Sequence, residues 1–225
     1  MQKVIITGAT DGIGKALVKE LYGKYELIIT GRSKEKMDKI LLDYPNVYAR
    51  CFDITNYNEL DKFINDIKDK FNHIDHIINN AGANIKKREV KDLNIDELRY
   101  MIELNCISNV ILIQGFINEM INRKEGHIIN VLSSCCLYNN VTMSGYTASK
   151  KAMEAISSIL MKEVKDYNVK VTNIYPGGVD TNFRANERKD YLRPETIAKT
   201  IHNCMLIDDG NIQEIVIRPS VENNY

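Results

Sequence analysis

The chain has 225 residues, of which 44% are hydrophobic and 27% charged, a composition typical of a soluble globular protein and unlike a collagen-like, low-complexity or disordered chain. Its 30 Lys and Arg balance its 30 Asp and Glu, and this net charge of zero argues against a nucleic-acid partner, whose phosphates normally require a basic excess. We expect one domain over 1–225, because a chain of this length buries most of its apolar surface in a single core.

Short β-branched segments alternate with longer segments of helical period from end to end. Near-continuous Val and Ile runs are typical of strands covered on both faces, as in a parallel sheet. The alternation predicts an α/β fold, a doubly wound, Rossmann-type parallel sheet of about seven strands with helices on both faces. The expected strands are 3–7, 26–30, 46–52, 75–79, 127–132, 170–175 and 213–218. The expected helices are 13–22, 34–43, 57–71, 94–122, 146–166 and 194–207.

Targeting and metal signals are missing from the sequence. No stretch approaches the roughly 18 consecutive apolar residues of a membrane span, and the first apolar run begins too early to leave room for a signal peptide. The 5 Cys are odd in number and lie mostly in apolar stretches, which is typical of reduced thiols. Neither C-x-x-C nor H-E-x-x-H occurs. We therefore expect a cytoplasmic protein without a metal site or a membrane contact.

A glycine-rich turn follows the first predicted strand, and a helix begins at once. Glycine permits a tight turn and a close approach of the backbone to a pyrophosphate, which binds the free N–H groups at the positive end of a helix. The spacing differs from G-x-G-x-x-G, since Leu17 stands where a third close glycine would fall, but the place after strand one indicates a nucleotide site. The alternative is a turn without a ligand. The residues expected at the nucleotide are Gly8, Thr10, Asp11, Gly12, Ile13 and Gly14.

The end of the second predicted strand bears on which nicotinamide cofactor is used. A carboxylate about 20 residues beyond the glycine turn would bind the ribose 2′-hydroxyl of NAD, whereas an arginine suits the 2′-phosphate of NADP. Gly31 and Arg32 occupy that place, and no Asp or Glu follows until Glu35. The sequence therefore favours NADP. The alternative is a solvated arginine at a strand end.

An acidic residue follows the third predicted strand. Asp53, beside Ile54, is expected at the cofactor, where its carboxylate would accept a hydrogen bond from the adenine amine. It would equally serve as a cap of the next helix, although Thr55 and Asn56 are the more obvious caps.

Four motifs occur along the chain, namely TGATDGIG at 7–14, NNAG at 79–82, YTASK at 146–150 and the Pro-Gly pair at 176–177. The short-chain dehydrogenases/reductases carry such motifs in the same order, and the chain resembles that family over nearly its whole length. A Tyr-x-x-x-Lys pair alone is expected roughly once by chance, so the joint order carries the resemblance. The resemblance implies transfer of hydride between a nicotinamide cofactor and a small carbonyl or alcohol substrate.

Tyr146 and Lys150 are expected to carry the proton chemistry. They stand four residues apart and share a helix face, where an ammonium lowers the pKa of a phenol from its usual value near 10. The resemblance implies that Tyr146 donates a proton to the carbonyl oxygen, or removes one in the oxidative direction. It also implies that Lys150 holds the nicotinamide ribose. The alternative for Tyr146 is an amphipathic residue at a helix start.

Two further residues are expected to be catalytic through the resemblance. Ser133 lies 13 residues before Tyr146, the spacing at which the family places a serine that stabilises charge on the substrate oxygen; Ser134 is the competing assignment. Asn105 stands midway along the fourth predicted helix, where an asparagine is unfavourable and needs a reason. The resemblance implies that it holds a water linking Lys150 to solvent, and the alternative is an asparagine exposed on the helix surface.

Two short segments complete the expected cofactor site. Small residues after the fourth strand would let the backbone pass close to the cofactor, and the segment after the sixth strand resembles the one that grips the nicotinamide amide. The alternative for the second segment is a plain turn. The residues are Asn80, Ala81, Gly82, Pro176, Gly177, Val179 and Thr181.

The surroundings of this site give weaker indications. In the resembled family the span corresponding to 182–193 forms a mobile lid that selects the substrate, and its polar composition here suits a small or polar carbonyl compound. Members of the resembled family commonly pair through the fourth and fifth helices, and residues 107–117 are apolar nearly all round, so the resemblance implies a homodimer. The unusual Leu132 and Cys135-Cys136 motivate a second hypothesis, a non-catalytic NADP(H)-sensing protein on the same fold.

Overall fold

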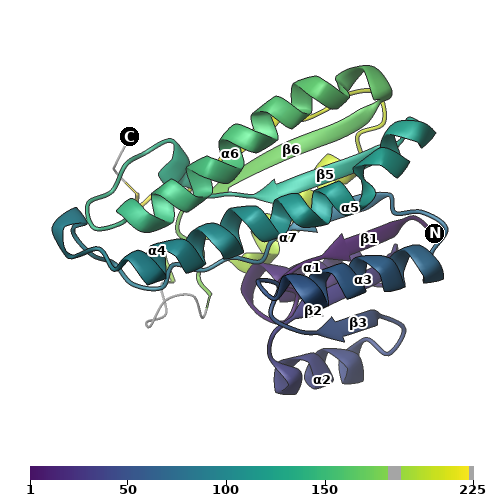
Figure 1. Ribbon diagram of the computed structural model, residues 1–225, viewed down its shortest axis with the longest axis horizontal. Coiled ribbons are helices and arrows are strands. Elements are labelled where there is room, and N and C mark those ends of the chain that lie inside the picture. The colour runs from purple at the N-terminus through teal and green to yellow at the C-terminus, as the bar shows by residue number, and fades with distance from the viewer. Residues whose placement is uncertain (182–188, 223–225) are drawn as a thin grey trace.

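The computed structural model describes residues 1–181 and 189–222 and contains one sheet of seven parallel strands (Figure 1). The strand order β3-β2-β1-β4-β5-β6-β7 runs outward in both directions from β1. Parallel sheets of this kind bind ligands outside the carboxyl ends of the strands, where the order reverses. The strands are β1 (Lys3–Ile6), β2 (Glu26–Gly31), β3 (Tyr48–Cys51), β4 (His76–Asn79), β5 (Gly126–Val131), β6 (Val169–Pro176) and β7 (Glu214–Ile217).

Helices cover both faces of the sheet. Figure 1 shows α3, α5 and α6 in front of the strands, while α1, α2 and α7 pack on the opposite face. The predicted doubly wound, Rossmann-type fold is therefore confirmed. The helices are α1 (Gly12–Leu21), α2 (Lys34–Asp43), α3 (Tyr57–Lys70), α4 (Ile95–Ile102), α5 (Ser108–Arg123), α6 (Ser144–Val164) and α7 (Pro194–Met205).

The core lies in two layers, one on each face of the sheet. Successive side chains of a strand point to opposite faces, so Ile5 packs with α3, α5 and α6, whereas Val4 and Ile6 pack with α1, α2 and α7. All three are fully buried. Burial of each such side chain stabilises the fold by roughly 1.5–3 kcal/mol, which explains why these strands are apolar without alternation.

The fourth predicted helix differs from the expectation. The sequence predicts one regular helix over 94–122, but α4 and α5 are separated by a π-helical segment, η2 (Glu103–Ile107). By length and composition the combined run Ile95–Arg123 would be able to cross a membrane, yet half of its most apolar window is buried inside the molecule, as in the core helix of a globular protein. A π-helical turn often marks a functional position, and this one contains Asn105.

Candidate active site

A cleft of about 940 Å³ opens at the carboxyl ends of the strands and collects most of the predicted site residues. Those that line it are Gly8, Thr10, Asp11, Gly12, Ile13, Arg32, Asp53, Ile54, Asn80, Ala81, Gly82, Tyr146, Lys150, Pro176, Gly177, Val179 and Thr181. Gly14, Asn105 and Ser133 are not among the lining residues. Lining residues that the sequence did not mark as site residues are Thr30, Gly31, Ser33, Lys36, Phe52, Ala83, Asn84, Ile85, Lys86, Lys87, Leu104, Val131, Leu132 and Met143.

The glycine turn is shaped by close approaches of the backbone. Gly8 has a φ of +63°, a conformation that other residues rarely adopt. A Cβ on Gly14 would lie 2.1 Å from the Gly8 carbonyl oxygen, so Gly14 packs beneath the turn and not at the cleft surface. Asp11 caps α1, its Oδ1 accepting a hydrogen bond from the Gly12 N–H at 2.8 Å. The turn thereby presents the N-terminus of α1 to the cleft.

Hydrogen bonds tie the glycine turn to the end of β4. The Thr7 hydroxyl accepts hydrogen bonds from the backbone N–H groups of Asn80 (3.0 Å) and Ala81 (2.9 Å). In return, the Asn80 side-chain amide donates to the carbonyl oxygens of Thr7 (2.9 Å) and Gly8 (3.2 Å). Thr7 is a residue that the sequence analysis missed, although a polar residue at the end of an apolar strand was a signal. These bonds hold the two strand ends at the switch point in one fixed arrangement.

Two basic residues follow β2, Arg32 directly after the strand and Lys36 in the first turn of α2. The Arg32 guanidinium donates to the Tyr100 hydroxyl at 3.2 Å, and that hydroxyl donates in turn to Asp53 Oδ2 at 3.4 Å. Lys36, one helical turn after Arg32, forms an ion pair with the carboxylate of Asp11. Lys36 therefore neutralises the acidic residue of the glycine turn, a contact that spacing along the chain did not predict.

The alternatives for the segment after β3 are partly resolved. Asn56 caps α3, with its Oδ1 accepting from the Glu59 N–H at 3.3 Å. Asp53 does not cap this helix, because its Oδ1 accepts hydrogen bonds from the N–H (3.0 Å) and the hydroxyl (2.8 Å) of Thr55 in the preceding turn. The contact of Asp53 with an adenine amine stays a prediction.

Tyr146 and Lys150 stand in the first two turns of α6 and both line the cleft, although their side chains are buried. The Lys150 ammonium donates to the carbonyl oxygen of Val131, the last residue of β5, at 2.8 Å. Burial lowers the pKa of this ammonium, since removal from water disfavours the charged form. The bond to Val131 therefore anchors α6 to the strand end at the position where Lys150 meets the cleft.

Asn105 is fully buried, so the alternative hypothesis of an asparagine exposed on the helix surface is wrong. Its Oδ1 accepts from the Ala83 N–H at 2.9 Å, and its Nδ2 donates to the Ala83 carbonyl (2.9 Å) and to Ser149 Oγ (2.8 Å). The Ser149 hydroxyl donates to the Tyr146 carbonyl at 2.8 Å. Asn105 thus connects the segment after β4 to the first turn of α6, and both of its amide hydrogens are used. The expected water next to Lys150 stays a prediction.

Ser133 is half-buried at the start of the loop after β5. It follows Leu132, which lines the cleft, and its hydroxyl accepts from the Cys135 N–H at 3.2 Å. The Cys136 thiol and the Ser133 hydroxyl also act on the thiol of Cys135. A hydrogen bond between the free thiols of Cys135 and Cys136 lowers the pKa of Cys135 and raises the pKa of Cys136. The choice between Ser133 and Ser134 remains open.

Hydrogen bonds hold the turn after β6 from two sides. The Gly177 N–H donates to the Ile217 carbonyl at 2.8 Å, and the Asp180 N–H donates to the Leu192 carbonyl at 2.8 Å. Between them Val179 lines the cleft, and within 1–181 and 189–222 its backbone N–H has no hydrogen-bond partner. Of the predicted lid over 182–193, residues 182–188 lie outside the described part of the chain. A buried backbone N–H without a partner is costly, and the Val179 N–H, unpartnered within the described residues, is available to a ligand in the cleft.

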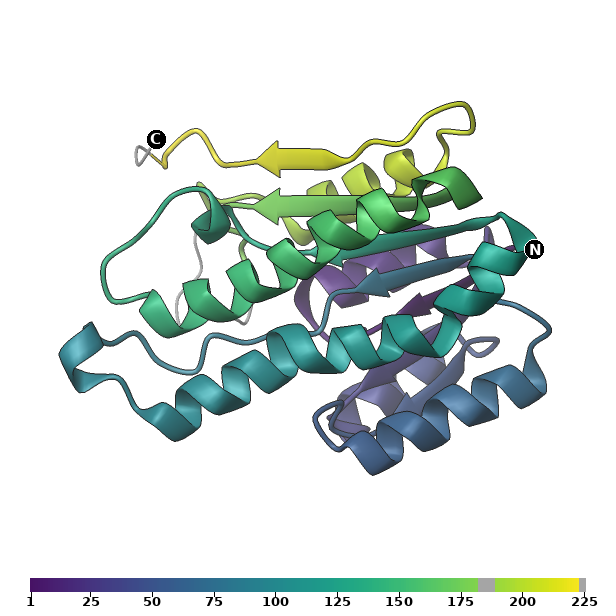
Figure 2. The same ribbon diagram turned by 45° about the horizontal axis from the view of Figure 1, so that its top comes forward.

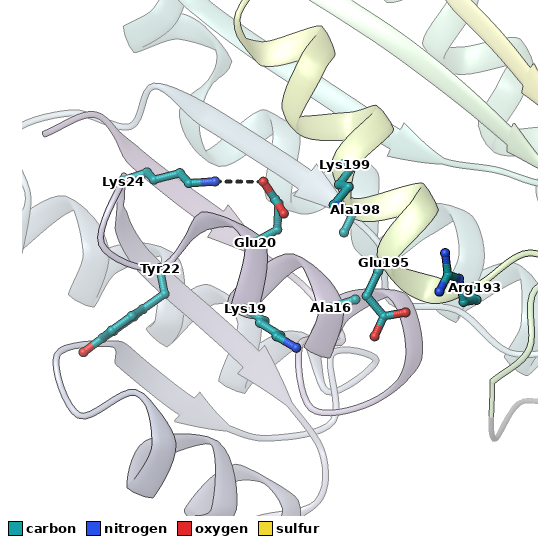
Figure 3. Close-up of a pocket in the computed structure, with 9 residues that line it drawn as sticks. All are labelled: Ala16, Lys19, Glu20, Tyr22, Lys24, Arg193, Glu195, Ala198 and Lys199. Atoms are coloured by element: carbon teal, nitrogen blue, oxygen red, sulfur yellow. Dashed lines mark hydrogen bonds and ion pairs between the residues drawn. The ribbon is translucent and has the colours of Figure 1, made fainter.

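A second, smaller hollow of about 410 Å³ lies between α1 and α7. Figure 3 shows basic and acidic side chains around it, with Lys24 bonded to Glu20 at 2.8 Å. It lies off the carboxyl ends of the strands, and none of the predicted site residues lines it. The cleft is therefore the candidate active site.

The sequence model of the short chain dehydrogenase family matches residues 2–192. The chain belongs to this family. An uncharacterized oxidoreductase of Staphylococcus aureus is similar to this short-chain dehydrogenase at 31% identity over 223 residues, with 96% of each chain covered. The predicted family is therefore confirmed, and the protein is an oxidoreductase of a family that uses nicotinamide cofactors and small-molecule substrates.

Solved structures support the fold. An alcohol dehydrogenase from the archaeon Thermococcus sibiricus, complexed with 5-hydroxy-NADP, is similar at 23% identity with a TM-score of 0.91, over 99% of this chain and 98% of that one. A closed form of serine dehydrogenase complexed with NADP+ is similar at 22% identity with a TM-score of 0.91, over 99% and 96% of the two chains.

Proposed function

We propose that this short-chain dehydrogenase is an NADP-dependent oxidoreductase that transfers hydride between the nicotinamide and a carbonyl or alcohol group of a small substrate. One observation carries the proposal. A single cleft is lined at one end by the glycine turn and Arg32 and at the other by Tyr146, Lys150 and Val179. An elongated dinucleotide needs both ends, because its pyrophosphate and its nicotinamide are recognised by different groups.

The residues present fit a dinucleotide. The turn at Gly8 and Gly14 excludes side chains where the backbone must approach a pyrophosphate, and the positive N-terminal end of the α1 dipole suits its charge. At the other end the Val179 N–H, which has no partner among the residues that the structure describes, suits the carbonyl oxygen of the nicotinamide amide. Pro176, Gly177 and Thr181 line the cleft beside it.

The basic residues at the end of β2 support NADP over NAD. Arg32 and Lys36 both line the adenosine side of the cleft, and Arg32 occupies the place where a carboxylate would select NAD. The ion pair of Lys36 with Asp11 removes a negative charge that would otherwise repel the phosphates. Two structurally similar proteins bind NADP or its 5-hydroxy derivative, in agreement with this choice.

The proposed chemistry divides between the cofactor and the chain. When bound, the cofactor supplies the hydride that reaches the carbonyl carbon. Tyr146 donates its phenolic proton to the carbonyl oxygen, and the Ser133 hydroxyl donates a hydrogen bond to the same oxygen as negative charge develops there. The buried Lys150 ammonium favours the phenolate form of Tyr146 and so lowers the barrier to proton transfer.

Asn105 has a supporting part in this proposal. Its bonds to Ala83 and, through Ser149, to the Tyr146 carbonyl set the orientation of the first turn of α6. A π-helical turn is what brings the Asn105 side chain to these partners from the middle of a long helix. Preorganisation of this kind matters, because a displacement of about 1 Å costs on the order of a hundredfold in rate.

The remaining expectations belong to the same proposal. The chain would act as one domain over 1–225, and five free cysteines suit a reducing cytoplasm. Exposed Ile107 lies on η2, directly before α5, and exposed Ile156 and Ile159 lie on α6, which supports a homodimer through this face.

The proposal is tested by following the loss of NADPH absorbance with a panel of ketones, aldehydes and 3-oxo acids. Wild type is expected to turn over at least one of them, and Tyr146→Phe is expected to lose roughly a hundredfold to ten-thousandfold in kcat, the usual contribution of a positioned proton donor. Unchanged turnover in Tyr146→Phe would remove the tyrosine from the mechanism. Tight NADPH binding with no turnover of any carbonyl would instead favour the NADP(H)-sensing alternative.

A further inference from the structure

The chain after β7 folds back over the turn that follows β6. Figure 2 shows this C-terminal segment at the same end of the molecule as the loop between β5 and α6. The Glu222 N–H donates to the Pro219 carbonyl at 3.1 Å, which closes a turn. Its carboxylate accepts two further hydrogen bonds, from the Gly178 N–H at 2.7 Å and from Arg218 Nε at 3.1 Å.

These contacts are largely removed from water. The Arg218 and Glu222 side chains are only 7% and 18% exposed, and charge-assisted hydrogen bonds are strengthened in such surroundings. A Cβ on Gly177 would lie 2.4 Å from Glu222 Oε2, so the carboxylate approaches the turn as closely as a glycine permits. The Arg218 guanidinium stacks on the Tyr138 ring, 4.3 Å from its centroid. Glu222 and Arg218 therefore join the C-terminal segment to two loops beside the cleft.

These contacts bear on the cleft because of the position of Gly178 in the chain. It directly precedes Val179, whose N–H is the donor available to a ligand in the cleft. Leu192 holds the other side of Val179, because its N–H donates to the Gly178 carbonyl at 3.0 Å and its carbonyl accepts from the Asp180 N–H at 2.8 Å. The Gly178 carbonyl belongs to the same peptide group as the Val179 N–H, so Leu192 holds that group directly, and Glu222 holds the preceding peptide group between Gly177 and Gly178.

We propose that Glu222 is a positioning residue for the nicotinamide end of the cleft, acting through the Gly178 N–H. Arg218, stacked on Tyr138, holds the Glu222 carboxylate in place. The inference rests on the proposed function, since it requires a nicotinamide cofactor in the cleft. Loss of the carboxylate would free the peptide between Gly177 and Gly178 to rotate. The resulting shift of Gly178 would turn the Val179 N–H, then held by Leu192 alone, away from the carboxamide.

The test compares Glu222→Ala with Glu222→Gln and with the control Val221→Ala, which truncates a half-exposed neighbour in the same segment. The dissociation constants of NADPH and of adenosine 2′,5′-bisphosphate, which lacks the nicotinamide, are measured for each variant. Glu222→Ala is expected to weaken NADPH binding about tenfold and to leave binding of the bisphosphate unchanged. Glu222→Gln keeps an acceptor for the Gly178 N–H and is expected to recover most of the loss, and Val221→Ala to match wild type.

Several outcomes overturn the inference. Equal weakening of both ligands in Glu222→Ala would mean a general structural role, and equal NADPH binding in all variants would mean no role. Where Glu222→Ala does not fold, Tyr138→Leu replaces it, because this change removes the ring on which Arg218 stacks and is expected to weaken NADPH selectively. A wild-type protein that binds the bisphosphate and NADPH but turns over no carbonyl contradicts the proposed function alone; one that binds neither contradicts both.

Discussion

At the scale of single residues, the chemistry of the cleft depends on where charges are paired. Lys36 pairs with Asp11, Arg32 donates to Tyr100, and Lys150 is buried against the Val131 carbonyl. Each contact holds a cation at the cleft. Lys36 is neutralised by Asp11, so Arg32 is the cation at this end that, in the proposed function, suits a dinucleotide carrying an additional phosphate.

Arg32→Ala is predicted to weaken NADPH selectively. A charge-assisted hydrogen bond to a phosphate contributes about 1.5–3 kcal/mol, so KM for NADPH is expected to rise roughly tenfold to a hundredfold while KM for NADH stays within about twofold. Steady-state kinetics with both cofactors measure this ratio. Lys34→Ala is the control, since Lys34 does not line the cleft and pairs with Asp38. An equal rise for both cofactors would assign Arg32 no part in distinguishing them.

At the scale of elements, two histidines are paired in register on neighbouring strands of the sheet. His76 of β4 stands opposite His127 of β5, their rings 5.8 Å apart and both buried. Burial lowers the pKa of His76 to about 4 and that of His127 to about 3. Both imidazoles are therefore neutral in the folded protein at pH values where the unfolded chain already binds protons.

This pair predicts acid-sensitive stability. The folded pKa values lie below the unfolded value of 6.5, so the stability is complete above pH 6.5 and is lost as pH falls toward the folded values. By pH 4 each histidine is expected to reduce the free energy of unfolding by on the order of 3 kcal/mol. Urea unfolding between pH 7 and about pH 4 measures the loss.

Non-titrating variants provide the control for the pH prediction. His127→Gln retains a donor for the Thr172 hydroxyl, which His127 contacts at 2.8 Å. This variant is expected to reduce the slope of the unfolding free energy against pH by the contribution of one proton. A double variant that also carries His76→Gln is expected to reduce this slope by the contribution of two protons. The same slope in all three proteins would mean that other groups govern the acid sensitivity.

At the scale of the whole molecule, the helical layer of α5 and α6 combines a buried face with an exposed apolar one. Leu112, Phe116 and Met153 pack into the core, whereas Ile156 and Ile159 are 41% and 59% exposed. An exposed apolar face on helices that already cover the sheet is typical of an interface between subunits.

Ile159→Glu is therefore predicted to convert the proposed dimer into a monomer, because it introduces a charge into the apolar face. Sedimentation velocity at micromolar concentration measures the change. Leu42→Glu is the matched control, since Leu42 is 82% exposed but lies on α2, across the sheet. A wild-type protein that sediments as a monomer would contradict the proposed dimer, and dissociation of both variants would place the interface elsewhere.

Local patterns in the sequence predicted the seven strands and the doubly wound fold. The motifs and the family resemblance that they carry added the family and just over half of the residues that line the cleft. Apolar runs such as Val4 to Ile6 indicate a strand buried on both faces of a parallel sheet. The glycine at position 8 indicates a backbone conformation that other residues rarely adopt. Such signals are readable because each depends only on the residue and its near neighbours.

Only the tertiary structure decided how distant residues meet. The Lys36–Asp11 pair, the π-helical turn that carries Asn105 to Ala83, and the Glu222 carboxylate on Gly178 join residues 22 to 44 positions apart. No local periodicity encodes these contacts, because they form only once the sheet has brought separate strand ends together. The sequence by itself determined which groups are available for catalysis, and long-range packing determined where their hydrogen bonds point.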